Sequence, residues 1–128
     1  MSYYFSKTLA TSFAEAVDRV TEELKKEGFG VLTEIDVKET LKKKLGVDFR
    51  PYKILGACNP PFAYQALQAE DKIGVMLPCN VILQEIAEGE VEVAAMDPVG
   101  AMQVVESPQL QEVAGQVRAK LVSVIDRL

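Results

Sequence analysis

The sequence predicts an α+β fold, in which two long helices pack on one face of a mostly antiparallel β-sheet. Apolar residues recur at helical spacing over residues 12–28 and 107–128. Residues 80–87 and 91–97 alternate like strands around a turn that contains Gly89, which indicates a β-hairpin. The other segments do not follow the strict strand and helix alternation of a parallel sheet. An open sheet covered by helices on one side is therefore expected.

The first half of this pattern starts with a strand at residues 2–9 and continues into an amphipathic helix. Ser12 and Glu15 have the S-x-x-E spacing of a capping box, and Gly28 ends the helix. A stripe of apolar side chains at helical spacing normally faces a sheet. The stripe consists of Phe13, Val17, Val20 and Leu24.

Two further strands and a short helix follow. Residues 29–37 alternate, with β-branched side chains on one side, which favours a strand. Residues 38–49 read as a short, charged and exposed helix that ends at Gly46. Residues 50–58 then predict a third strand. Pro51 stands at its start, where no backbone N–H is needed for a hydrogen bond to a neighbouring strand.

Two more helices are indicated by their first residues. Asn59 is a typical N-cap, and Pro60 follows at the first helical position of residues 59–70. Ser107 and Pro108 begin the terminal helix in the same way. If the uncovered face of the sheet is also apolar, a second subunit is its simplest cover. The buried face of the terminal helix is expected to consist of Leu110, Val113, Val117, Leu121, Val124 and Leu128.

Length and charge limit the classes of function. The 128 residues suit a single domain that spans residues 1–128. A net charge of −5 disfavours nucleic acid as a partner, and the basic run Lys42, Lys43 and Lys44 reads as a solvated helix face. No apolar run reaches membrane-spanning length, and the N-terminus lacks the features of a signal peptide. We expect a cytoplasmic protein without a membrane partner.

The absence of histidine also limits the chemistry. It removes the usual general base, every nucleophile pair that needs an imidazole, and the commonest metal ligand. Whether the protein is an enzyme stays open, with a non-catalytic role favoured. Gly56 and Gly74 are isolated and form no nucleotide-binding motif. A zinc site would need two ligands beyond the two cysteines, so neither a metal nor a cofactor is expected.

Both cysteines lie in the stretch GACNPPFAYQALQAEDKIGVMLPCNV, residues 56–81, and each precedes an asparagine. Cys58 stands before a helix start, where backbone N–H groups and the helix dipole favour a thiolate. The alternative is that Cys58 is the last buried residue of the third strand. Cys79 follows Pro78 and reads as the buried first residue of a central strand. A disulfide would require Cα atoms within about 7 Å. If one of the two cysteines is a reactive thiol, Cys58 is the candidate.

These motifs, together with VEVAAMDP, resemble the family of bacterial and archaeal proteins called domain of unknown function 302. The resemblance covers nearly the whole chain and is most specific in CNP, LPCNV and DP. It implies a β-α-β(4)-α fold related to that of the TATA-binding protein, with two helices against a curved antiparallel sheet, and a homodimer. It implies no reaction. The candidate site residues that it marks are Cys58, Asn59, Pro60, Leu77, Pro78, Cys79, Asn80, Asp97 and Pro98.

Three functions remain compatible with the sequence. The first is a dimeric binding module that holds a small molecule or a partner near the CNP and LPCN turns, where the amides of Asn59 and Asn80 supply hydrogen bonds. The second is a structural or interaction protein without a ligand, in which these turns fix the fold. The third is a thiol redox or metal–thiolate site built from Cys58 and Cys79. Asp97 alone reads as a turn residue that ends a strand.

Overall fold

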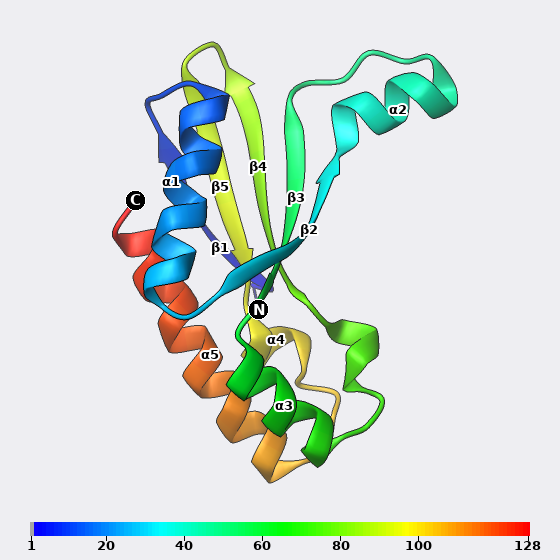
Figure 1. Ribbon diagram of the computed structural model, residues 1–128, viewed down its shortest axis with the longest axis vertical. Coiled ribbons are helices and arrows are strands. Elements are labelled where there is room, and N and C mark those ends of the chain that lie inside the picture. Colours follow the sequence, from blue (N-terminus) through cyan, green and yellow to red (C-terminus); the bar gives the residue numbers. More distant parts are fainter. Residues whose placement is uncertain (1) are drawn as a thin grey trace.

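The computed structural model describes residues 2–128 and consists of one antiparallel five-stranded sheet with helices on one face and at one end (Figure 1). The strand order is β1-β5-β4-β3-β2, and the sheet does not close into a barrel. This confirms the α+β class. The strands are β1 (Tyr4–Leu9), β2 (Gly30–Asp36), β3 (Tyr52–Cys58), β4 (Cys79–Ala87) and β5 (Glu90–Met96). The helices are α1 (Phe13–Lys26), α2 (Val37–Leu45), α3 (Pro60–Ala69), the 3-10 turn η1 (Ile73–Met76), α4 (Pro98–Ala101) and α5 (Pro108–Asp126).

The two long helices, α1 and α5, cover the same face of the sheet (Figure 1). Both begin with the predicted caps, because the Ser12 hydroxyl accepts a hydrogen bond from the Glu15 N–H, and the Ser107 hydroxyl accepts one from the Leu110 N–H. Their apolar stripes meet the inward side chains of the central strands. The fully buried core includes Val20, Leu24, Leu55, Val81, Leu83, Val91, Val93, Leu110, Leu121 and Val124.

The short helices divide into two groups. α3, η1 and α4 lie beyond the lower end of the sheet, where α3 and α4 run beside the first half of α5 and η1 contacts α3 (Figure 1). α2 instead stands away from the body next to β2 and β3, and none of its residues is buried. The sequence pattern missed η1 and α4, because elements of four residues are too short to show a helical period.

One strand departs from the predicted alternation. Val31 lies opposite Ala57, but Thr33 lies opposite Gly56, so the chain contains an irregularity at Leu32. A bulge of this kind adds one residue to a strand and sends the following side chains to the other face. Thr33 and Ile35 therefore share the face away from α1 and α5, whereas Val31 faces the core. The sequence predicted that the β-branched side chains of residues 29–37 all lie on one side of the strand, and the bulge makes this prediction wrong.

Candidate functional site

An apolar pocket of about 350 Å³ opens where β3 and β4 meet the lower helices. Its volume lies near the lower end of the range of about 300 to 1,000 Å³ that is usual for small-molecule sites. No charged side chain contributes to its wall. The lining residues are Phe29, Leu32, Ala57, Cys58, Asn59, Phe62, Ala63, Ala66, Leu67, Gly74, Leu77, Pro78, Cys79, Pro98, Met102, Leu110, Val113, Ala114 and Val117.

The pocket exists because small side chains line two neighbouring helices. Ala63 and Ala66 belong to α3, and Ala114 belongs to α5, which packs beside α3. Helices in contact usually fill the space between them with interdigitating side chains. Alanine methyl groups are too short to do so here, while Phe62 and Met102 wall the space from α3 and from the residue that follows α4.

Asn59 is the buried polar residue of this wall. It is 8% exposed and is the N-cap of α3, as predicted, but its side chain makes no capping hydrogen bond. Its amide Nδ2 instead donates to the backbone carbonyl of Glu27, at 3.0 Å, and so joins the start of α3 to the end of α1. Among residues 2–128 the Oδ1 atom accepts no hydrogen bond, and it is not sealed from solvent. Asn59, which lines the pocket, therefore keeps one unpaired acceptor.

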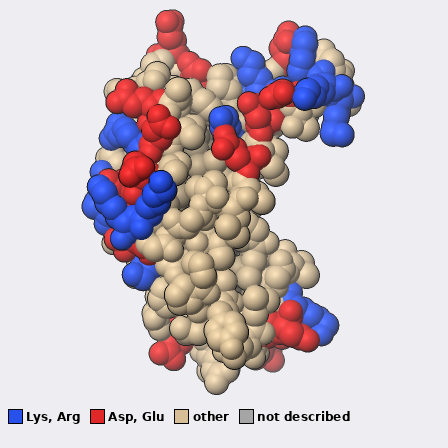
Figure 2. All heavy atoms as spheres, in the orientation of Figure 1, with Lys and Arg blue, Asp and Glu red and all other residues tan. Residues whose placement is uncertain are grey.

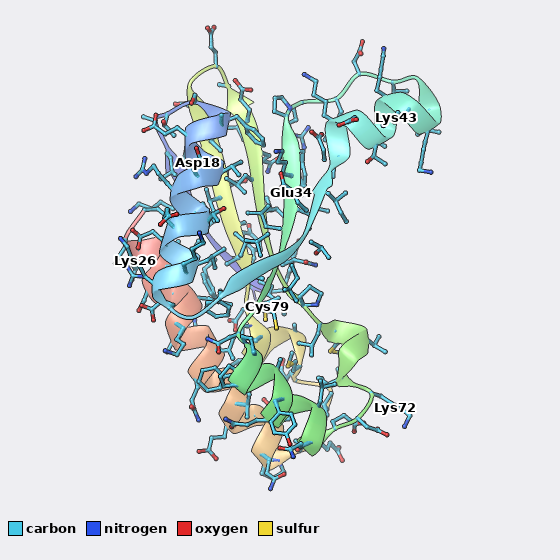
Figure 3. All side chains as sticks on the ribbon, in the orientation of Figure 1. Asp18, Lys26, Glu34, Lys43, Lys72 and Cys79 are labelled. Atoms are coloured by element: carbon cyan, nitrogen blue, oxygen red, sulfur yellow. The ribbon has the colours of Figure 1, made fainter. Side chains whose placement is uncertain are left out.

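The two thiols are free and line the same pocket. Cys79 lies opposite Ala57 in the β3–β4 ladder, so it is offset by one position from Cys58, the last residue of β3. Burial, and to a smaller extent the neighbouring Cys58, raises the pKa of Cys79 from 9.0 to about 11. Cys79 is consequently a neutral thiol at pH 7. Figure 3 places it where the strands run into the lower helices.

The start of α3 offers little to a thiolate at Cys58. Its first two residues are Pro60 and Pro61, which have no backbone N–H to donate. Together with a neutral Cys79, this removes two features on which thiol chemistry would depend.

The other candidate residues take separate positions. Pro78 and Leu77 line the pocket, whereas Pro60 and Asn80 are exposed and do not. Asn80 lies opposite Gly56, on the sheet face away from α1 and α5.

Asp97 has a clear role outside the pocket. Its carboxylate accepts hydrogen bonds from the N–H groups of Val99 and Gly100 and lies 3.1 Å from the guanidinium of Arg118. Asp97 thus caps α4 and connects it to α5, while the next residue, Pro98, is buried and reaches the pocket wall.

Most of the wall was not predicted as a site. No sequence motif pointed to Phe29, Phe62 or Met102. The terminal-helix residues in the wall were expected only to be part of the core; they are Leu110, Val113 and Val117. The signal that was available is the row of alanines in α3 and α5, because small residues on facing helix surfaces leave space between them.

The surface around the pocket is also poor in charge. Figure 2 shows that charged side chains gather over α1 and α2 and at the lower rim, whereas the middle of this face is nearly free of them. Leu32 and Leu67 at the pocket are 68% and 42% exposed. Residues 2–128 contain no cluster of three or more His, Cys, Asp or Glu side chains that could hold a metal ion. No helix in the same range is long and apolar enough to cross a bilayer.

The fold and the pocket define a small α+β protein with an open antiparallel sheet and an apolar pocket at one end. The family model "Domain of unknown function DUF302" matches residues 5–128, and the chain therefore belongs to this family. It is similar to the crystal structure of an uncharacterized conserved DUF302 protein from Bacillus stearothermophilus, with 31% sequence identity and a TM-score of 0.91. The match covers 99% of this chain and 98% of that one. A search of curated protein sequences found no match.

Proposed function

We propose that the protein is a binding module that holds a small molecule in the pocket between α3, α5 and the ends of β3 and β4. The observation that carries this proposal is a preformed apolar pocket of about 350 Å³, with exposed apolar residues beside it. A ligand that covers such a surface removes it from water, which is the main favourable contribution to binding at apolar sites.

Filling the pocket is expected to abolish this binding. Ala63 is half-buried and lines the pocket, so Ala63→Phe places a ring in the space that the ligand would occupy. We expect the affinity for 1-naphthol or for an uncharged environment-sensitive naphthalene dye to fall about tenfold or more, the equivalent of about 1.4 kcal/mol. Fluorescence titration of both probes measures the change.

The matched control is Gln65→Phe, which adds a ring to the same helix at an exposed position that does not line the pocket. It should leave both affinities within about twofold of the wild-type values, since it removes no space from the pocket. Equal losses in the two variants, or no saturable binding to the wild-type chain, would contradict the proposal.

We also propose that the binding module is a homodimer. The face of the sheet away from α1 and α5 carries a continuous row across four strands, in which Ile35, Ile54, Ile82 and Ala94 lie opposite one another in turn. Ile35 at the end of this row is 48% exposed. Unpaired apolar rows of this kind are typical of interaction surfaces.

Charge favours a second copy of this chain as the partner. α2 lacks buried residues and is basic in its last turn, where Lys42, Lys43 and Lys44 lie. The β4–β5 hairpin is acidic, with Glu85, Glu88, Glu90 and Glu92. For a two-fold dimer that pairs the two open faces, we propose that α2 of one copy lies near the β4–β5 hairpin of the other, where opposite charges complement each other.

Sedimentation of Ile54→Lys tests the dimer. A lysine in the middle of the isoleucine row buries an unpaired charge if two faces meet, so the variant is expected to sediment as a monomer while the wild-type chain sediments as a dimer. Gln116→Lys, on the exposed side of α5, should remain dimeric. A monomeric wild-type chain at about 100 µM would refute this part of the proposal, because an interface with a micromolar Kd would be populated there.

A further inference from the structure

The polar atoms of the pocket indicate which kind of molecule it accepts. The polar side chains in the wall are one asparagine and two cysteines, and every other lining side chain is apolar. Thiols form only weak hydrogen bonds, whereas an amide oxygen is a strong acceptor with two lone pairs. Asn59 is nine-tenths buried, and its Oδ1 accepts no hydrogen bond from the residues that the structure describes. Solvent still reaches this oxygen, so a donor on a ligand can pair with it in place of water.

We infer that the ligand is an uncharged, mainly hydrocarbon molecule that carries one hydroxyl or N–H group, which donates its hydrogen bond to Asn59 Oδ1. This inference rests on the proposed function, since it specifies what the same pocket binds. The two aromatic rings in the wall, Phe29 and Phe62, favour a ligand with a ring system, because aromatic pairs gain energy beyond the area they bury.

A charged ligand is disfavoured because nothing in the wall compensates a charge. Transfer of an ion into apolar surroundings without a partner costs several kcal/mol in proteins. One cation lies close to the wall, Lys120, whose Nζ is 6.0 Å from the ring centroid of Phe62. It already lies 3.8 Å from the carboxylate of Glu27, so it is not a free counterion for a bound acid.

A donor on the ligand is favoured by how the Asn59 amide is held. Its Nδ2 donates to the Glu27 carbonyl, and this contact fixes which end of the amide is nitrogen and which is oxygen. The side chain lies against Gly28, where an added Cβ would be only 3.1 Å from Nδ2. Gly28 also has a φ of +85°, which glycine adopts without strain. The turn at the end of α1 therefore holds the amide in one orientation.

Three naphthalene probes separate the requirements of this inference. 1-Naphthol carries a donor, 1-methoxynaphthalene keeps the oxygen but loses the donor, and 1-naphthoate adds a negative charge at pH 7. Calorimetric titration of the wild-type chain is expected to show 1-naphthol binding about fivefold tighter than the ether, as one hydrogen bond predicts. The carboxylate is expected to bind about tenfold or more weakly than 1-naphthol.

Asn59→Ala removes the acceptor and should abolish the preference for 1-naphthol over the ether, while both still bind. If this variant does not fold, the comparison of the three probes on the wild-type chain still decides. Equal binding of naphthol and ether to the wild-type chain would overturn the requirement for a donor but would still support the proposed binding function. Tighter binding of the carboxylate would overturn the requirement for a neutral ligand. Failure of all three probes to bind would overturn the proposed function and this inference together.

Discussion

Gly56→Ala is expected to lower the free energy of unfolding by about 3 kcal/mol, at the upper end of the usual cost of overpacking a core. Gly56 lies in the middle of β3, between Thr33 on β2 and Asn80 on β4. A Cβ at this position would collide with the Thr33 hydroxyl oxygen and would come within 2.7 Å of the Pro78 ring. The Thr33 side chain is stiff about χ1 and the proline ring cannot rotate away, so the backbone has to move.

Urea unfolding, followed by far-UV circular dichroism, measures this loss. Gly115→Ala is the matched control, because a Cβ on Gly115 in α5 meets nothing within 4 Å. It should stabilise the protein by up to about 1 kcal/mol, since alanine has less conformational freedom than glycine in the unfolded chain. If Gly56→Ala is as stable as the wild-type protein, the close packing of Thr33 and Pro78 over β3 is refuted.

The Gly56 substitution also connects the sheet to the pocket. Pro78 lines the pocket, and its ring lies beside the position that a Gly56 Cβ would occupy. An added methyl group that displaces this ring also changes the shape of the pocket wall. A folded Gly56→Ala protein should therefore bind 1-naphthol more weakly than Gly115→Ala does.

The sequence predicted the helices better than the sheet, and the reason is the range of the interactions involved. The caps of α1 and α5 depend on residues three positions apart, Ser12 with Glu15 and Ser107 with Leu110, so a local pattern contains them. The bulge at Leu32 depends instead on how β2 pairs with β3, a partner more than twenty residues away. Alternation within one strand carries no information about such a shift.

The candidate site shows the same limit. Asn59 was singled out as a cap, and its position is the predicted one, but its amide bonds to the Glu27 carbonyl, thirty-two residues away in sequence. The pocket likewise needs α3 and α5 side by side, which no periodicity in either helix specifies. The cysteine motifs correctly indicated the end of the sheet at which the pocket lies. The alanines that leave space for the pocket, in contrast, looked like ordinary helix residues.

Cys79 is expected to make the protein less stable as the pH rises from 9 to 11. Below pH 9 the thiol is protonated in both the folded and the unfolded chain, so it adds no pH dependence. Above pH 9 the unfolded thiol loses its proton, while the folded one, whose pKa is about 11, keeps it. The folded state then binds more protons than the unfolded state, and the free energy of unfolding falls by about 2 kcal/mol by pH 11.

Lysine and tyrosine side chains also titrate in this range, so the measured quantity is the difference in stability between the wild-type protein and Cys79→Ala. At pH 7 the variant should be less stable, because a buried side chain is truncated. By pH 11 the wild-type protein loses this advantage, and the two stabilities should converge or cross. Urea unfolding at pH 7, 9, 10 and 11 under reducing conditions follows the change.

A Cys58→Ala background separates the two causes of the raised pKa of Cys79. Burial is the larger cause and the neighbouring Cys58 the smaller, so most of the pH dependence should persist when Cys79 is the only thiol. Loss of the effect in this background would assign the raised pKa to the pair of thiols and would reopen thiol chemistry at the site. A stability difference that stays constant from pH 7 to pH 11 would mean that the folded thiol ionises freely.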